Sequence, residues 1–186
     1  MPNLAYVFWH HPLAGIAAAD YEEALQGFHR TLSAHAPQGF HHSTAFAFRG
    51  VPWFPSASGY LDWYTVDDFT SLGLLNEAAV AGARKEPHDH VARMTGAGFG
   101  GLFRLVAGNV SLQQINAGTW LTKPAGMPYN TFLDQISKLI DASSMALWQR
   151  QMALGPGLEF CLHSAGPIEI PEIFGPVPIE LRQIWS

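Results

Sequence analysis

The sequence predicts one compact α+β unit built from two diverged copies of a β-α-β-β-α-β motif, which together form an α+β barrel. Three observations predict this fold. Strand-like and helix-like segments follow that order through residues 1–110. A shorter version of the same order occupies residues 111–186. The strands of the first copy are apolar on both faces, so the side that the helices leave free must also be covered, and the second copy is expected to cover it.

The first copy begins with a strand over 4–11, a run of aromatic and β-branched residues that ends at a proline. Asp20, followed three residues later by Glu23, forms a capping-box pattern and predicts the start of a helix. One apolar stripe runs along this helix at spacings of four, three and four, formed by Tyr21, Leu25, Phe28 and Leu32. A proline and a glycine within 37–39 are expected to end the helix.

Two more strands are expected in the first copy, over 41–48 and 60–65. Asp67 or Asp68 is placed to cap a second helix, because a short side chain there can accept a hydrogen bond from the first turn. These elements continue the strand-helix-strand-strand-helix order.

The last part of the first copy is expected to hold a short helix and a strand. Pro87 suits the first turn of the helix, and the strand is expected over 101–107. The glycine-rich run 96–101 is interpreted as the turn before that strand. With it the first copy completes the ferredoxin-like plan.

The second copy repeats this order in reduced form. A strand is expected over 118–122, and Asn130 caps a helix. The apolar stripe of this helix lies 108 residues beyond the first one and comprises Tyr129, Leu133, Ile136 and Ile140. Residues 145–153 fit either a strand or an extension of the helix, and a proline-rich segment at 167–178 replaces the second helix. The later strands are expected over 158–163 and 179–185.

Composition excludes several classes of protein. Hydrophobic residues make up 48% of the chain and aromatic residues 12%, which argues against disorder, while a charged fraction of 13% predicts a homodimer. A net charge of −5 without a basic run argues against nucleic-acid binding. The apolar N-terminal stretch is too short for a signal peptide or a membrane span. The single cysteine, Cys161, cannot form an internal disulfide, so a cytoplasmic location is expected and this thiol is interpreted as core filler.

One local pattern resembles a known superfamily. The first predicted helix carries a late histidine in Phe28-His29, and a turn with the sequence Pro37-Gln38-Gly39-Phe40 follows it. This run is similar to the corresponding segment of EthD-like and related small monooxygenase-like proteins of the dimeric α+β barrel superfamily, with one glutamine separating the usual proline and glycine. The resemblance implies a small hydrophobic ligand held between sheet and helices, and it makes His29 the match to the helix histidine of that family.

Several residues are candidates for a binding site. His29 is the candidate catalytic residue, because an imidazole titrates near neutrality and can act as a general base. The ligand is expected in the apolar barrel, near Tyr6, Trp9, Trp63 and Tyr64. His10 and His42 either line this pocket or are exposed residues at strand ends. Trp53 lies in an apolar loop over 49–59, which is expected to be either a lid or a flap packed on a partner subunit.

His88-Asp89-His90 is the remaining local pattern. On a strand two histidines two residues apart could share a metal, but Pro87 and the residues after the triplet favour a helix, where they diverge. Capping of the helix is therefore preferred to a metal site, and haem with His88 or His90 as axial ligand stays an alternative.

The expected function is binding and conversion of a small hydrophobic or aromatic compound, by cofactor-free oxygenation, isomerisation or cyclisation. The alternatives are a non-catalytic module that binds a small ligand or is associated with stress, and a haem-binding protein.

Overall fold

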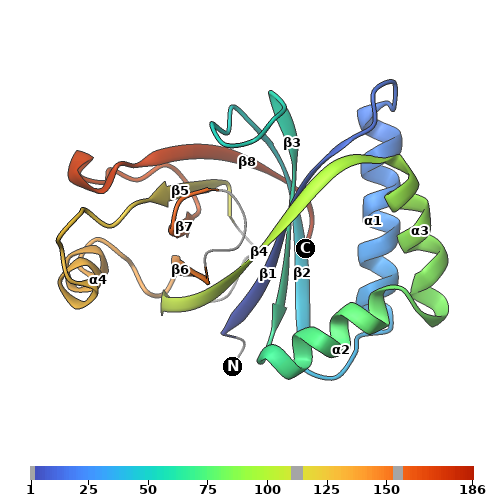
Figure 1. Cartoon of the computed structure of the whole chain (residues 1–186), viewed down its shortest axis with the longest axis horizontal. Helices are drawn as coiled ribbons and strands as arrows, with labels where there is room; N and C mark the ends of the chain where they lie inside the picture. Colours follow the sequence, from blue (N-terminus) through green and yellow to red (C-terminus); the bar gives the residue numbers. More distant parts are fainter. Residues whose placement is uncertain (1–2, 110–114, 153–156) are drawn as a thin grey trace.

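The computed structural model describes residues 3–109, 115–152 and 157–186. In these residues eight strands form a closed antiparallel barrel, in the order β1-β3-β2-β8-β5-β7-β6-β4 (Figure 1). The first half comprises β1 (Leu4–Pro12), α1 (Ala18–Ala34), β2 (Phe40–Arg49), β3 (Ser58–Val66), α2 (Phe69–Ala79), the short turn η1 (Gly82–Arg84), α3 (Lys85–Met94) and β4 (Thr95–Gly108). The second half comprises β5 (Ala117–Leu121), α4 (Tyr129–Ser137), β6 (Ala146–Gln151), β7 (Phe160–Ser164), the turn η2 (Glu172–Phe174) and β8 (Val177–Trp185).

The two halves share one strand order, which confirms the expected pair of motifs. The first half reads β4-β1-β3-β2 and the second β8-β5-β7-β6 around the barrel, so corresponding strands take corresponding places. Antiparallel pairs β2–β8 and β4–β6 join the halves. The chain therefore closes its own barrel, as the two apolar faces of the first-half strands predict.

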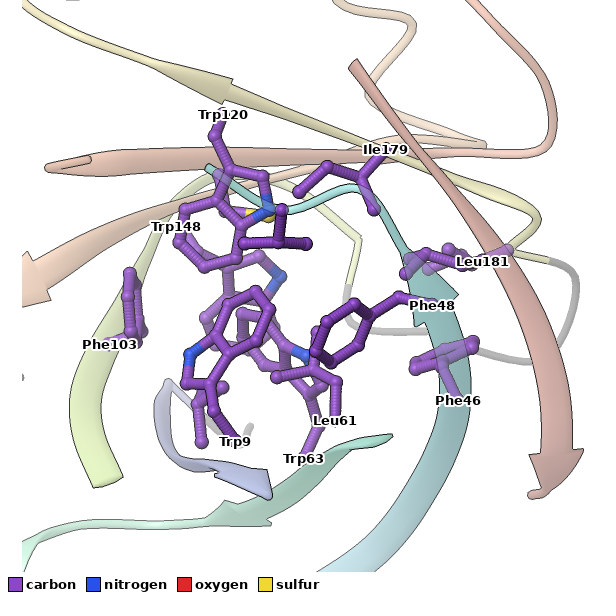
Figure 2. Close-up of a cluster of buried hydrophobic side chains, with 14 of the residues drawn as sticks. Trp9, Phe46, Phe48, Leu61, Trp63, Phe103, Trp120, Trp148, Ile179 and Leu181 are labelled. Atoms are coloured by element: carbon purple, nitrogen blue, oxygen red, sulfur yellow. The ribbon is translucent and has the colours of Figure 1, made fainter. Parts of the chain in front are cut away.

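The barrel lumen is filled by side chains. Four tryptophans from four strands meet there and are almost wholly buried, namely Trp9, Trp63, Trp120 and Trp148 (Figure 2). Rings from neighbouring strands complete the packing, and Cys161 lies among them, buried as expected. Burial raises the pKa of the Cys161 thiol well above its usual value, so the thiol stays protonated.

The loop between β2 and β3 closes one end of this lumen. Phe54 is buried and Trp53 packs against the lumen cluster, where its ring lies 5.4 Å from that of Trp120 and 6.0 Å from that of Trp9. Trp53 and Phe54 of this apolar loop therefore cover the aromatic core of their own barrel, and packing of the loop on a partner subunit stays a prediction.

Helices α1, α2 and α3 cover the outer face of the first half, and α4 lies at the opposite side of the barrel (Figure 1). The predicted stripe of α1 faces the sheet and is buried. The capping-box prediction was wrong: the helix begins at Ala18, Ala17 makes no capping side-chain bond, and Asp20 lies in the first turn. Asp68 does cap α2, and its carboxylate accepts the Ser71 backbone N–H at 2.8 Å.

Strand β4 is longer than expected, because the glycine-rich run 96–101 belongs to the strand and not to a turn. β1 pairs with β4 along this run. A Cβ at Gly98 would lie 2.4 Å from the Phe8 ring, and a Cβ at Gly100 would lie 2.4 Å from the Tyr6 ring. The glycines therefore leave room for aromatic rings of β1 to lie across β4. The glycine content alone predicted a turn and could not reveal this packing.

The second half is reduced, as expected. The proline-rich segment forms only η2 in place of a helix, and the ambiguous segment 145–153 holds strand β6. The predicted stripe of the second helix was only partly right. Phe132 and Ile136 are the buried residues of α4, whereas Tyr129 is 49% exposed, and Pro128 rather than Asn130 precedes the helix. In the part of the chain that is described, no helix is both long and apolar enough to cross a membrane.

Candidate functional site

A pocket of about 1090 Å³ lies between the outer face of the first-half sheet and helices α1, α2 and α3. Its floor is made by β1, β3 and β4 and its walls by apolar side chains of the helices. Phe69, the first residue of α2, and Val80, just after its end, line it although each is about half exposed, so its mouth lies along that helix. A concave, mainly apolar space with a few polar groups is typical of a small-molecule site.

A buried carboxylate, Asp62 of β3, is the centre of the pocket floor. Its Oδ2 atom lies 3.2 Å from His10 Nε2 and 3.4 Å from His29 Nε2, and it accepts the Tyr64 hydroxyl at 3.0 Å. Asp62 is only 1% exposed and lines the pocket, and its Oδ1 atom has no hydrogen-bond partner among the described residues. A buried carboxylate oxygen without a donor is costly, which marks this atom as an available acceptor.

Asp62 is ionised in the folded protein. Burial alone would raise the pKa of the Asp62 carboxyl, but the facing His10 and His29 rings outweigh it and hold that pKa well below its usual range. The charge of Asp62 in turn acts on Tyr64, whose pKa is raised well above its usual value by burial and by the carboxylate. Tyr64 therefore stays protonated and donates to Asp62.

Each histidine is also held from its other side. His29 Nδ1 lies 2.7 Å from the Ser43 hydroxyl, and its ring stacks on Trp185 of β8 with centroids 6.2 Å apart. His10 Nδ1 lies 2.6 Å from the Tyr21 hydroxyl. The two imidazoles thus converge on one carboxylate from α1 and β1, and neither ring can turn without losing a contact.

Tyr6 offers a second polar group to the pocket. Its hydroxyl makes no hydrogen bond in the part of the chain that is described, and its ring lines the floor beside Gly100. Burial raises the pKa of Tyr6, and Asp62 raises it further, so the phenol keeps its proton and can donate to a ligand. The pocket floor therefore presents the Tyr6 hydroxyl as a donor and Asp62 Oδ1 as an acceptor on a mainly apolar background.

Alternation along the strands explains where the predicted site residues lie. Tyr6, His10 and Tyr64 share the outer face with Asp62 and line this pocket, while their role in binding a ligand stays a prediction. Trp9 and Trp63 point into the packed lumen, and Trp53 closes its end, so none of the three lines the pocket. The expected location of the ligand inside the barrel is corrected for this reason: the lumen is occupied by side chains.

The predicted histidines are separated in the same way. His29, the candidate catalytic residue, is fully buried behind Asp62 and does not line the pocket. His42 lies elsewhere, with Nδ1 3.1 Å from the Thr65 hydroxyl, and burial lowers its pKa. On α3, His88 lines the pocket rim and His90 is exposed, so the two do not converge on a shared metal site. No metal-binding cluster is found among the described residues.

Asp62, Tyr21 and Thr95 are site residues that sequence reasoning missed. Asp62 is the only charged residue of β3 and lies between Tyr60 and Tyr64 at alternate positions. An ionisable residue within an otherwise apolar strand costs free energy unless it is paired, so it was a detectable signal of function. Tyr21 gave no such signal, because its place in the apolar stripe of α1 is equally typical of core packing.

Haem fits this pocket poorly. In His10 and His29, Nδ1 contacts a hydroxyl and Nε2 faces the Asp62 carboxylate at 3.2 and 3.4 Å, which leaves His88, with Nδ1 3.2 Å from Asp89, as the pocket imidazole that could ligate iron. Haem carries two carboxylates, yet among the described residues that line the pocket there is no lysine or arginine to pair with them, and the floor already holds the Asp62 carboxylate beside His10. Like charges in a buried space repel, so no step of the chemistry is assigned to haem.

The glycines of β4 that lie under aromatic rings of β1 make a testable contribution to the stability of the fold. We expect Gly100→Ala to lower the free energy of unfolding by about 1–3 kcal/mol, because the new methyl group would overlap the Tyr6 ring. Gly166→Ala is the control, because a Cβ there would enter open space and the backbone φ of Gly166 is ordinary. Gly126 is unsuitable, because its positive φ would strain an alanine. Denaturant unfolding of both variants measures the difference, and equal stability would contradict the close approach of Tyr6.

Comparisons with known proteins bear on the fold. No family model matches the sequence, and no curated protein matches it either. Among solved structures, an anthrone oxidase-like protein is 11% identical with a TM-score of 0.54, over 98% of this chain and 91% of that one. A candidate chlorite dismutase is 13% identical with a TM-score of 0.52, over 90% and 82% of the two chains. At these identities the likeness concerns architecture alone: this chain has the dimeric α+β barrel fold that chlorite dismutase and anthrone oxidase-like proteins share.

Proposed function

We propose that this protein binds a small hydrophobic or aromatic compound in the pocket over Asp62 and converts it through proton transfer. Oxygenation without a cofactor, isomerisation and cyclisation can all begin with removal of a proton from a weakly acidic C–H or O–H group. A buried, ionised carboxylate between two histidines, at the floor of an apolar pocket, is the observation that carries the proposal.

The apolar walls support a hydrophobic substrate. Phe8, Phe28 and Phe99 surround the floor, and a planar ring can stack on such side chains while its polar edge meets Tyr6 and Asp62. Exclusion of water from this space strengthens the interaction of Asp62 with any proton donor. The fold that is shared with an anthrone oxidase-like protein agrees with an aromatic substrate, as does the EthD-like and small monooxygenase-like pattern of α1 and its following turn.

Two helical glycines allow a matched test of where the ligand binds. Gly73 of α2 lines the pocket and Gly27 of α1 does not, and a Cβ would enter open space at both. Replacing either by leucine raises helix propensity by about 0.8–1 kcal/mol, so the two variants should be similarly stable. We expect Gly73→Leu to abolish binding of aromatic ligands found by a thermal-shift screen, and Gly27→Leu to retain it.

The screen also separates the proposed enzyme from a non-catalytic binding module. Incubation of each hit with the protein in air, followed by mass spectrometry of the compound, detects oxygenation, isomerisation with a retention shift, or cyclisation. Hits that bind but stay unchanged would favour the binding module. Binding that survives in Gly73→Leu would remove the pocket from the proposal.

A further inference from the structure

A chain of hydrogen bonds connects the floor of the pocket to the end of helix α3. His10 Nδ1 lies 2.6 Å from the Tyr21 hydroxyl, and that hydroxyl lies 2.9 Å from the Thr95 hydroxyl. The Thr95 hydroxyl in turn donates to the Val91 carbonyl at 2.9 Å. The chain is almost wholly buried at His10 and Tyr21, so the protein and not solvent determines where its protons lie.

The carbonyl at the end fixes the direction of every bond in this chain. A carbonyl oxygen only accepts, so the single proton of Thr95 is used on Val91. Thr95 can then only accept from Tyr21, which uses the single proton of the phenol. The Tyr21 oxygen must therefore accept from His10, and Nδ1 of His10 carries a proton. Burial raises the pKa of Tyr21 well above its usual value, so the phenol does not lose its proton.

The other nitrogen of His10 faces the carboxylate. Nε2 lies 3.2 Å from Asp62 Oδ2, and a carboxylate that is ionised can only accept. The two atoms are at ion-pair distance without the alignment of a hydrogen bond, so charge decides the contact: a proton on Nε2 makes the ring a cation beside a buried anion, which is attractive. Both ring nitrogens of His10 are thus protonated.

We propose that His10 is a fixed imidazolium cation in the resting protein, that Asp62 is the proton acceptor of the pocket through Oδ1, and that Tyr21 and Thr95 are positioning residues for this charge pair. The assignment to Asp62 rests on the proposed function; the charge of His10 does not. In the reaction the substrate C–H or O–H bond breaks, the proton moves to Asp62 Oδ1, and the electron pair stays on the substrate. Because the facing rings lower the pKa of Asp62, the carboxylate alone is a weak base, and it takes the proton only as the new substrate anion replaces it as the partner of the His10 cation. The resulting anion then lies beside the His10 cation, which stabilises it.

The groups around His10 are consistent with one net positive charge on the ring. Phe8 stacks at a centroid distance of 5.0 Å and Tyr60 at 5.7 Å, and the Tyr60 hydroxyl donates away from the site to Glu22. Among the described residues, His29 is the other basic group beside Asp62, and it faces Asp62 rather than His10. Its Nδ1 contact is to Ser43, a hydroxyl that can donate or accept, so the neutral form of His29 is fully compatible with its surroundings.

Nitrogen NMR of the resting protein labelled with ¹⁵N-histidine tests the charge directly. At about pH 8, above the ordinary range for histidine, we expect one residue to show protons on both ring nitrogens, and its signals to disappear in His10→Gln. If every histidine is neutral at that pH, the proposed cation is wrong. This measurement needs no substrate and no variant for its main result.

Thr95 and Tyr60 provide the matched variants. In Thr95→Val the Tyr21 hydroxyl loses its acceptor and turns to donate to His10 Nδ1, so we expect the Nδ1 proton signal to be lost at about pH 8. Thr95→Ser restores the hydroxyl and should restore the cation. Tyr60→Phe removes a hydroxyl from a ring that also stacks on His10 but lies outside the chain, and the cation should persist. Loss of the cation in Tyr60→Phe, or its persistence in Thr95→Val, would overturn the directional chain.

The outcomes of the two proposals are distinguishable. A cation at His10 without conversion of any compound would leave the charge assignment intact and remove the proposed function. If the protein converts a compound while His10 is neutral, the proposed function stands and the role assigned to the hydrogen bonds from His10 to Val91 is overturned. The pH profile of kcat is then compared between Thr95→Val and Thr95→Ser. A difference between the two profiles shows that the positioning residues act through the charge of His10.

Discussion

Asp62→Asn is expected to lower kcat/KM by about 10²–10⁴-fold on the compound that the screen identifies, the range typical of losing a general base. The amide keeps the shape of the side chain but cannot accept the proton. The proposed loss should appear in kcat, because the apolar walls that hold the substrate are unchanged. Asp67→Asn is the control: this neighbouring carboxylate is exposed, pairs with His41 and lies outside the pocket. Unchanged turnover in Asp62→Asn would contradict the role of Asp62.

The same variant has a second expected effect, on stability. Removing the charge leaves the buried His10 without its partner, and breaking a buried pair costs about 3–5 kcal/mol. Because the pKa of Asp62 is lowered in the folded state, its contribution is fully present above the unfolded value of about 4 and is lost as pH falls below it. The difference in unfolding free energy between wild type and Asp62→Asn should therefore be large at neutral pH and shrink below about pH 4.

His163 is expected to make the barrel sensitive to acid. It is fully buried on β7, with Trp63 4.4 Å away and Phe46 6.2 Å away between ring centroids. Burial lowers the pKa of His163 to about 3, so the folded protein binds fewer protons there than the unfolded chain. Its contribution is present above the unfolded pKa of about 6.5 and is lost as pH falls toward 3.

The magnitude follows from the distance between the two pKa values. At about pH 4, some 2.5 units below the unfolded value, the loss is about 3 kcal/mol. We expect His163→Leu to flatten the decline in stability between about pH 6.5 and 4, since a leucine has no proton to gain. His90→Leu, the same change at an exposed position, should leave the decline as it is. A wild-type protein whose stability is flat over this range would contradict the neutral burial of His163.

The spacing of apolar residues along the sequence predicted most of the fold, because it reflects which side chains are buried. The stripe of α1 and the two apolar faces of β1 and β3 indicated both the helices on one side and the closed barrel on the other. Periodicity failed where glycine replaces a side chain: residues 96–101 of β4 have no pattern of their own, since rings from β1 cover them. It also misplaced the cap of α1, because Asp20 and Glu23 match a motif that the tertiary structure did not use.

The site was predicted only in part. Tyr6, His10 and Tyr64 were expected near a ligand, and strand alternation then decides that they face the helices, away from Trp9 and Trp63. Asp62, the residue that organises them, was missed because partners far apart in sequence, His10 from β1 and His29 from α1, are needed to hold its carboxylate. Side chains that meet only in the folded protein leave no local pattern in the sequence. A single charged residue in an apolar strand, such as Asp62 in β3, nevertheless indicates that buried partners are present.

The reduced second half has a consequence for stoichiometry. On β3 the helix-facing side chains are Tyr60, Asp62 and Tyr64, and on β7, the corresponding strand, Phe160 and Leu162 face outward. The outer face there is an apolar cluster beneath α4, in which Phe160 and Leu162 pack with Phe132 and Ile136. A barrel assembled from two identical subunits would carry a pair of equal sites by symmetry. When two unlike halves are joined in one polypeptide, symmetry no longer requires two equal sites. We therefore expect a ligand titration to saturate at one equivalent per chain.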